Sequence, residues 1–418
     1  MNYALVQPNW SFAGSTYFGC PESHLPLELL YARQQLQAAG HEVLLLDAHL
    51  EALEVESGAR RIRAFQPDFL VLTTAPTYLF WRCPQPELRV PAQWMRRLHQ
   101  AAPAAVTVAI GPHGSATPQA TKTKLACDVV IQGEADQVLA SLAAGDPVPP
   151  GFHQANMAQI PALDYTGYPM SLRRHRHHVF SGSGRGAEVE ATRGCPWACS
   201  FCNKTLFRNQ FRPRPLDAVV AELDSLARLG FDYVYFIDEI FGCARTTPAL
   251  LEALRPLPLT FGMQTRIDLW NEETLATLGA AGCVSLECGI ESVTPEGRER
   301  FRKGCRISTD RIETLLRIAR RHIPWVQANL IAGEHDDLDA IASWRSALVQ
   351  AGIWVSQPVP VFAFPGTPLY QQLFGAPDDQ AWERAHRHYL AANSARGYYS
   401  DVQDQAPQPL DQLEALPG

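Results

Sequence analysis

Short apolar runs alternate with helical patterns through the first 145 residues. The runs are continuous and partly β-branched, which is typical of strands buried on both faces of a parallel sheet. The leucines of LPLELLYARQQLQAAG, between the first two runs, fall on one face of a helix that ends near Gly40. This alternation predicts an open, doubly wound parallel sheet. Its expected strands are Ala4–Val6, Val43–Leu46, Phe69–Leu72, Val106–Ile110 and Val129–Ile131.

The residues that follow these strands are candidates for ligand contact. Ligands of open α/β sheets sit beyond the carboxyl ends of the strands, because the loops of neighbouring parallel strands meet at that edge. Here the edge is formed by Gln7–Trp10, Asp47–His49, Thr73–Pro76, Gly111–Ser115 and Gln132–Asp136.

The pattern changes after residue 145. Residues 146–186 are rich in proline and glycine and predict an interdomain connection; its basic run, 173–178, fits either a solvated loop or contact with an anionic group. Residues 187–370 alternate strand and helix again, with strands beginning near 187, 233, 259, 284, 326 and 353. Six such units predict a partial (β/α)6 barrel. Thr367 and Pro368 fit the start of a helix, and residues 371–418 predict a helical extension with a polar tail.

Three cysteines with C-x3-C-x2-C spacing, Cys195, Cys199 and Cys202, directly follow the first strand of the barrel region. Zinc typically takes four protein ligands, and this loop offers no fourth Cys or His. Iron–sulfur clusters also take thiolates, commonly four, so three thiolates on a four-iron cluster would leave one iron open for a reactant. We expect a 4Fe–4S cluster, with structural zinc and unmetallated cysteines as alternatives. Seven other cysteines lack ligand spacing and are expected to be small apolar residues: Cys20, Cys83, Cys127, Cys243, Cys283, Cys288 and Cys305.

The composition bounds the class of protein. Of the 418 residues, 46% are hydrophobic, which is typical of globular chains, and the length favours two or three domains. The net charge of −7 gives no general attraction to nucleic acid, so no such partner is expected. The first residues, MNYALVQPNW, lack a signal-peptide pattern, and no apolar run approaches the ~18 residues of a membrane span. We expect a cytoplasmic protein without a membrane partner.

The segment CPWACSFC at 195–202 resembles the signature of the radical S-adenosylmethionine (SAM) superfamily. The resemblance implies a TIM-type partial barrel, a 4Fe–4S cluster, SAM, and a one-electron reductant of flavodoxin or ferredoxin type. It also implies SAM contacts at the strand ends, although the family's Gly-Gly-Glu is absent at the second strand. Two alternatives stay open: Asp238 could cap the following helix, and Arg266 could pair with Asp268. The implied SAM contacts are Phe201, Asp238, Glu239, Arg266, Gly289, Glu291 and Ser292.

The region before this barrel resembles the cobalamin-binding domain of one radical SAM subfamily, a Rossmann-like or flavodoxin-like domain. The resemblance rests on LVQPNW, AAGHEVLLLDA, AIGPHGSATP and CDVVIQGEAD. Asp47 and His49 superficially match a cobalt-ligating D-x-H-x-x-G motif, but alanine replaces the glycine and the segment follows the wrong strand. We therefore do not expect His49 to bind cobalt. The implied cobalamin contacts are Asn9, Trp10, Thr73, Thr74, Gly111, His113, Gly114, Gly133 and Glu134.

Together these resemblances imply a four-part chain: a cobalamin domain at 1–145, a linker at 146–186, a radical SAM barrel at 187–370 and a C-terminal extension at 371–418. The implied activity is methyl transfer to an unactivated carbon of a small-molecule substrate. The alternatives are a cobalamin-dependent radical rearrangement, cyclisation or ring contraction, and a non-enzymatic cobalamin- or metal-binding module. Methylthio transfer to RNA is a further alternative, which the acidic charge disfavours.

Overall fold

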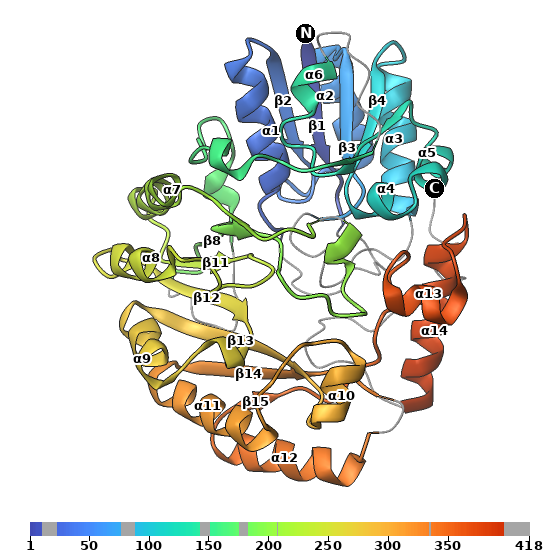
Figure 1. Ribbon diagram of the computed structural model, residues 1–418. Helices are drawn as coiled ribbons and strands as arrows, with labels where there is room; N and C mark the ends of the chain where they lie inside the picture. Colours follow the sequence, from blue (N-terminus) through green and yellow to red (C-terminus); the bar gives the residue numbers. More distant parts are fainter. Residues whose placement is uncertain are drawn as a thin grey trace.

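The computed structural model describes residues 1–10, 23–76, 88–142, 151–174, 183–206, 208–333 and 336–396. It contains two α/β units stacked on one another, with two C-terminal helices along one side (Figure 1). Cys20, Cys83, Glu334 and most of the basic run at 173–178 lie outside these ranges. No helix in the described ranges combines the length and apolar character needed to cross a membrane.

The first unit is a five-stranded parallel sheet with strand order β2-β1-β3-β4-β5. This is the doubly wound order in which the direction of winding reverses between β1 and β3. The predicted fold class is therefore confirmed for this unit. Its elements are β1 (Asn2–Gln7), α1 (Leu27–Ala38), β2 (Glu42–Asp47), α2 (Val55–Phe65), β3 (Phe69–Thr73), α3 (Arg89–Ala101), β4 (Val106–Ile110), α4 (Pro112–Ala116), α5 (Pro118–Leu125), β5 (Val129–Val130) and α6 (Leu139–Leu142).

Both faces of this sheet are buried, as continuous apolar strands require. In β1, Tyr3 and Leu5 pack on the side of α1 and α6, whereas Ala4 and Val6 pack on the side of α2 and α3. The alternation follows from the two-residue period of a strand. The second of these apolar layers continues into the other unit, so the two units share one hydrophobic core.

The second unit is a six-stranded parallel sheet with strand order β15-β14-β13-β12-β11-β8, wrapped by helices as a partial barrel (Figure 1). All six strands begin within one residue of the predicted positions. The elements are β8 (Gly186–Val189), β9 (Thr192–Arg193), η3 (Asn203–Leu206), β10 (Arg212–Pro213), α7 (Leu216–Arg228), β11 (Tyr233–Phe236), α8 (Thr247–Leu254), β12 (Thr260–Thr265), η4 (Ile267–Leu269), α9 (Glu272–Ala280), β13 (Cys283–Glu291), α10 (Pro295–Arg300), α11 (Thr309–His322), β14 (Trp325–Leu330), α12 (Leu338–Gln350) and β15 (Trp354–Val355).

The described part of the connecting segment packs between the units. Leu163, Tyr165 and Tyr168 are buried in the shared core. Arg173, at the start of the basic run, is fully buried and donates to both carboxylate oxygens of Glu188 at 2.5 and 2.6 Å. The solvated-loop interpretation therefore fails at Arg173, whose charge a buried carboxylate compensates. The segment contains β7 (Phe152–His153), η1 (Met157–Gln159) and η2 (Met170–Leu172); β7 pairs with β6 (Gln132–Gly133).

The C-terminal extension forms α13 (Pro368–Phe374) and α14 (Ala381–Arg396). The Thr367 hydroxyl accepts from the backbone N–H of Tyr370 at 3.2 Å and Pro368 occupies the first turn, so the predicted helix start is confirmed. In α14, Trp382 donates to the Thr117 hydroxyl at 3.0 Å and Glu383 pairs with Lys124. The last helix therefore packs against the first unit.

The carboxyl ends of the first sheet face the barrel. The chain starts at the far end of β1, marked N in Figure 1, so β1 runs toward the second unit. Side chains from this edge contact the barrel directly: His24, before α1, lies 2.7 Å from Glu188 in β8. Helix α4, which follows β4, contacts η3, which follows the three cysteines. The loops predicted to contact ligands in the first unit therefore face the cysteine-bearing loop of the second unit.

Candidate functional site

The cysteine-bearing loop runs from β9 to η3 and is held at several points by other elements. Cys195, Cys199 and Cys202 are all half-buried. The backbone N–H of Ser200 donates to the carbonyl of Phe301 at 2.9 Å, and the carbonyl of Ser200 accepts from Leu369 N–H at 2.9 Å. The barrel and the C-terminal extension thus both fix the middle of this loop.

Gly194, directly before Cys195, is required by the backbone. Its φ is +85°, and a Cβ added there would lie 2.0 Å from the carbonyl oxygen of Gln210. Its N–H donates to Glu239 Oε2 at 2.7 Å. A residue with a side chain would have a disfavoured left-handed conformation and would also collide with backbone.

The three thiols lie close enough to influence one another's pKa. Burial raises the pKa of all three thiols; that of Cys202 is raised to about 12, mainly by burial and in part by the charges of Cys199 and Cys195. Lys204 lies among them, with its ammonium donating to the carbonyl of Cys195. Because thiols bind metal as thiolates, loading this loop must release protons. Across the described ranges, no three His, Cys, Asp or Glu side chains are arranged around a position for one metal ion.

Glu291 and Lys303 lie beside Cys199. Lys303 Nζ donates to Glu291 Oε1 at 2.8 Å, and both side chains are largely buried. After burial, the main influences on the pKa of the Cys199 thiol are Lys303, which lowers it, and Glu291, which raises it. Glu291 has a φ of +65° at a register shift in β13, and a Cβ at Gly289 would lie 2.6 Å from its carboxylate. Gly289 therefore makes room for Glu291. Lys303 also belongs to the site, although no motif in the sequence indicates it.

Arg266 also lies against the cysteine loop. Its guanidinium is 4.3 Å above the ring of Trp197, which stands between Cys195 and Cys199. It donates to both carboxylate oxygens of Asp268 at 3.0 and 2.7 Å, so the local pair foreseen as an alternative is present. The two observations are compatible, because one guanidinium can pair at its edge and stack on its face.

Asp238 and Glu239 end β11 side by side but have different partners. Asp238 is buried and accepts from the N–H of Ala191 and the hydroxyl of Thr192, at 2.8 and 2.5 Å. It does not cap α8, which begins at Thr247. Glu239 binds the N–H of Gly194 and the guanidinium of Arg208. In this structure both carboxylates support the backbone that leads into the cysteine loop.

The remaining two implied SAM contacts stand in different surroundings. Phe201 is half-buried and packs edge-on against Phe301, with ring centroids 5.5 Å apart. The Ser292 hydroxyl is buried and accepts from the N–H of Thr294 at 3.2 Å, in the turn that starts α10. Arg266, Glu291 and Glu239 thus gather at the cysteine loop, whereas Asp238 holds the backbone that leads into the loop and the Ser292 hydroxyl is engaged in a local turn.

Asp238 predicts a specific pH dependence of stability. Burial raises its pKa from 3.8 to about 8. Because the folded state then holds a proton that the unfolded state releases between about pH 4 and pH 8, this residue makes the free energy of unfolding fall as the pH rises through that window. Asp238→Asn should flatten this slope. Urea unfolding at pH 5 and pH 8 measures it, and an unchanged slope in the variant would show that Asp238 is ionised in the fold.

The loops after β3 and β4 meet closely in the first unit. Gly111 has a φ of +120°, and a Cβ there would lie 2.7 Å from the hydroxyl oxygen of Thr74. His113 is fully buried with its Nδ1 3.3 Å from the same hydroxyl. The Thr73 hydroxyl is buried and has no hydrogen-bond partner among the residues that the structure describes. A bare backbone and a buried free hydroxyl at the carboxyl edge of the sheet fit the close approach of a bound group.

The loop after β5 is tightly constrained. Gly133 has a φ of +83°, and a Cβ there would lie 2.2 Å from the carbonyl oxygen of His153. Gly114, in α4, would place a Cβ 2.6 Å from Val130, so it packs against the end of β5. The carboxylate of Glu134 is buried and binds Arg193 and Arg212, both from the barrel unit. This loop therefore joins the two units.

The first-strand loop is described only as far as Trp10. Asn9 donates from its amide to the carbonyl of Leu53 at 3.1 Å, and Trp10 is fully buried in the shared core. His49 is buried as well; burial, followed by the charges of His24 and Arg173, lowers its pKa to about 3. His49 is therefore a neutral imidazole, and the expectation that its D-x-H pattern is fortuitous stays a prediction.

Besides Lys303, two further residues of the site carried no signal in the sequence. The ring of Trp382, in α14, packs against His113 with centroids 4.2 Å apart, so the C-terminal extension reaches the implied cobalamin loops. Asn203, directly after Cys202, is fully buried, and within the described part of the chain neither its amide oxygen nor its amide nitrogen has a hydrogen-bond partner. It starts η3, which contacts α4. A buried free amide between the two loops fits a bound polar group there.

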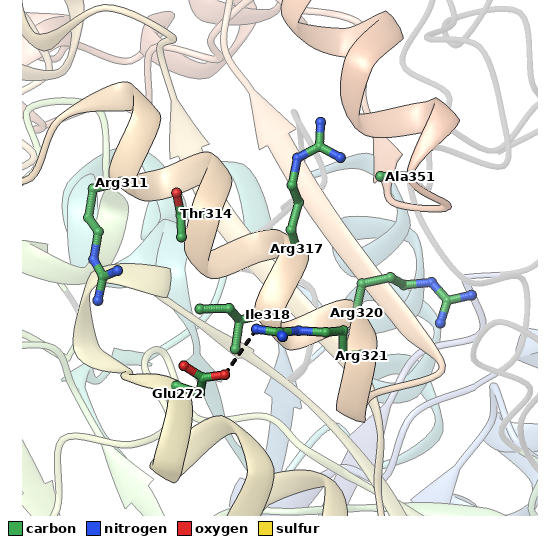
Figure 2. A pocket seen from close by; sticks show the side chains of 8 residues that line it. All are labelled: Glu272, Arg311, Thr314, Arg317, Ile318, Arg320, Arg321 and Ala351. Atoms are coloured by element: carbon green, nitrogen blue, oxygen red, sulfur yellow. Dashed lines mark hydrogen bonds and ion pairs between the residues drawn. The ribbon is translucent and has the colours of Figure 1, made fainter.

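A separate hollow of about 860 Å³ lies on the outer helices of the barrel and is not part of this site. Figure 2 shows arginines of α11 around it, with Arg321 directed at Glu272, 3.0 Å away. It is open to solvent and contains none of the implied cofactor contacts. Its lining residues are Glu272, Arg311, Thr314, Arg317, Ile318, Arg320, Arg321 and Ala351.

Two known domains match the chain. The radical SAM superfamily matches residues 189–344, and the B12-binding domain matches residues 20–143. The fold is similar to that of a solved radical S-adenosylmethionine methyltransferase, TsrM from Kitasatospora setae, with cobalamin and a 4Fe–4S cluster bound. The TM-score is 0.68 at 19% identity, over 88% of this chain and 76% of that chain.

Curated relatives match both domains together. The hopanoid C-3 methylase of Methylococcus capsulatus is 26% identical over 370 residues, which is 80% of this chain and 67% of the relative. The anaerobic magnesium-protoporphyrin IX monomethyl ester cyclase of Cereibacter sphaeroides is 23% identical over 410 residues, 89% of this chain and 64% of the relative. The chain thus spans about two thirds of the length of these relatives.

The chain thus combines a doubly wound domain with a partial barrel that carries a three-cysteine loop, and the carboxyl edge of the first sheet faces this barrel. With both domain matches in place, the chain belongs to the radical SAM superfamily and carries a B12-binding domain. These domains imply a 4Fe–4S cluster, SAM and cobalamin as cofactors. The positions of the thiols, the glycine-bearing loops and the free buried polar groups fit all three.

Proposed function

We propose that this protein is a cobalamin-dependent radical SAM methyltransferase that acts on an unactivated carbon of a small-molecule substrate. The observation that carries the proposal is the contact of η3, which ends the cysteine loop, with α4, which follows the glycine-bearing loop of the B12-binding domain. A methyl donor and a radical source must lie close together for such a transfer, and this contact brings their proposed binding loops together.

The chain contributes binding groups from both units. Cys195, Cys199 and Cys202 would ligate the cluster, and Glu291 and Arg266 would lie next to SAM at the strand ends. The cobalamin contacts would come from the loops at the carboxyl edge of the first sheet: Asn9, Trp10, Thr73, Thr74, Gly111, His113, Gly114, Gly133 and Glu134. When bound, these cofactors supply a 5′-deoxyadenosyl radical and a transferable methyl group.

The protein's own part is placement and exclusion of water. Lys303 neutralises Glu291 beside Cys199, so the carboxylate is held in one position in a largely buried setting. Asp238, Glu239, Phe201, Gly289 and Ser292 complete the strand ends around the loop. A closed site keeps water away from reactive species, which the shared core between the units favours.

The partners follow from the proposed chemistry. Cluster reduction needs a one-electron donor, for which we propose a flavodoxin or a ferredoxin, in the cytoplasm. The substrate is proposed as a small molecule, as the names of the relatives indicate for those proteins. The net charge of −7 supports the absence of a nucleic-acid partner.

A second candidate is a cobalamin-dependent cyclisation or other radical rearrangement without methyl transfer. The match to a cyclase over 89% of this chain favours it. The two candidates differ in their products. Methyl transfer consumes a second SAM and yields S-adenosylhomocysteine beside 5′-deoxyadenosine, whereas rearrangement yields no S-adenosylhomocysteine.

The test is anaerobic reconstitution with iron, sulfide and cobalamin, followed by turnover with methyl-labelled SAM and a cell extract as the source of substrate. We expect S-adenosylhomocysteine, 5′-deoxyadenosine and a small molecule that carries the labelled methyl group. 5′-Deoxyadenosine without S-adenosylhomocysteine would select the rearrangement. Absence of SAM cleavage by a protein with full iron and cobalamin content would favour a non-enzymatic binding module.

A further inference from the structure

A network of charged side chains is buried where the two units meet, and Arg193 is at its centre. Arg193 is fully buried in β9. It donates to Glu134 at 2.9 Å, to both carboxylate oxygens of Asp136 at 2.9 and 3.1 Å, and to both of Glu190 at 3.2 and 2.7 Å. These five contacts use all five N–H donors of a guanidinium.

The network continues to the start of the cysteine loop. Glu190 also accepts from Arg208 at 2.7 Å, and Arg208 donates in turn to Glu239 at 3.2 Å and to Glu28 at 3.3 Å. Glu239 accepts from the N–H of Gly194 at 2.7 Å. Although burial alone would raise it, Arg193 and Arg208 hold the pKa of Glu190 at about 2, so this central carboxylate is ionised.

The two ends of the network are the two cofactor loops. Arg193 stands two positions before Cys195, and Glu134 follows Gly133 in the loop after β5. One guanidinium therefore connects the loop proposed to hold the cluster with a loop proposed to hold cobalamin. Arg193 is separated by 59 positions in the sequence from Glu134 and by 57 positions from Asp136.

We propose that Arg193 is a positioning residue that sets the distance and orientation between the cluster and cobalamin; this rests on the proposed function. Buried ion networks add little net stability, because desolvation offsets the attraction, and their best-supported role is to fix one geometry. Radical transfer is sensitive to such geometry, since a displacement of about 1 Å can cost about 100-fold in rate. Arg193 contacts neither cofactor in this account; it acts through the two loops.

The test uses the full chain loaded with cluster and cobalamin and compares Arg193→Lys with the wild type. Lysine keeps the charge but has three N–H donors on a single nitrogen in place of five in a planar fork, so it cannot reproduce the two-point contacts with both Asp136 and Glu190. With the cluster reduced and cobalamin in its paramagnetic cobalt(II) state, electron paramagnetic resonance reports their spin–spin coupling. We expect one defined coupling in the wild type and a broadened or weakened one in Arg193→Lys. In turnover, 5′-deoxyadenosine formed per methylated product should rise about tenfold.

The matched control is Arg173→Lys. Arg173 is also fully buried and also joins the units, because it donates to Glu188 in β8 at 2.5 and 2.6 Å and to the Ser23 hydroxyl of the first unit at 3.3 Å; both partners lie outside the Arg193 network. It should lose a similar amount of thermal stability and keep the wild-type coupling. Equal broadening in both variants would mean general loosening and would overturn the proposal, as would an unchanged coupling in Arg193→Lys.

If Arg193→Lys does not fold, Asp136→Asn decides, because it removes one charge from the network at nearly constant volume. We expect it to broaden the coupling, and an unchanged coupling would overturn the proposal. The spectroscopic readout needs neither substrate nor turnover. Failure to find a methylated product would therefore contradict the proposed function and leave the result on Arg193 independent.

Discussion

Replacement of Cys199 by alanine is expected to remove the iron–sulfur cluster and with it the cleavage of SAM. Cys199 is the middle thiol of the loop and the one next to Glu291 and Lys303. Iron content should fall from about four per chain to well below one. SAM cleavage should fall by more than about 100-fold, because replacing even the residues behind metal ligands costs 10–100-fold. Iron analysis, visible absorbance and 5′-deoxyadenosine formation measure these effects.

The matched control for Cys199→Ala is Cys243→Ala. Cys243 is half-buried, and its pKa is influenced by Cys195, so it is a nearby thiol outside the C-x3-C-x2-C spacing. It should keep its iron and its activity. Loss of the cluster in Cys243→Ala together with its retention in Cys199→Ala would contradict the assignment of Cys199 as a cluster ligand.

Gly194→Ala is expected to disrupt the cysteine loop through the backbone alone. The left-handed conformation costs about 1–2 kcal/mol for a residue with a Cβ, and the overlap with the Gln210 carbonyl adds about 1–3 kcal/mol. The melting temperature of this 418-residue chain should fall by roughly 2–6 °C, and iron incorporation should fall with it. Calorimetry and iron analysis of the same preparation test both effects.

Gly40→Ala is the control that separates the cost of the left-handed backbone conformation from the cost of a steric overlap. Gly40 has nearly the same φ, +82°, but no atom lies within 4 Å of an added Cβ. Its cost should therefore be only the conformational part, about 1–2 kcal/mol, with full iron incorporation. A Gly194→Ala variant that behaves like Gly40→Ala would show that the loop can move away from Gln210 without harm.

Much of the fold could be predicted because it depends on local patterns. Continuous apolar runs placed the strands of both sheets, and Gly40 and Thr367 marked helix ends through their own backbone requirements. The pair between Arg266 and Asp268 was foreseeable for the same reason, because the residues are two positions apart.

What could not be predicted depends on contacts between distant segments. Trp382 meets Thr117 across 265 positions, and nothing in the sequence near either residue indicates it. The ion pairs of Arg193 and Arg173 could not be predicted, because a sequence does not reveal which carboxylates lie opposite a buried arginine. Glu239 likewise drew notice as a strand-end acid, but its contact with Gly194 appears only once β8, which leads to Gly194, lies beside β11.

The central claim is that three thiolates hold a cluster with one iron open to SAM, next to cobalamin. The most direct measurement is the electron paramagnetic resonance spectrum of the reduced, cobalamin-free cluster before and after addition of SAM labelled with ¹⁷O in its carboxylate. The account predicts shifted g values and a hyperfine coupling from the label. A complete four-iron cluster whose spectrum does not respond to SAM would contradict it.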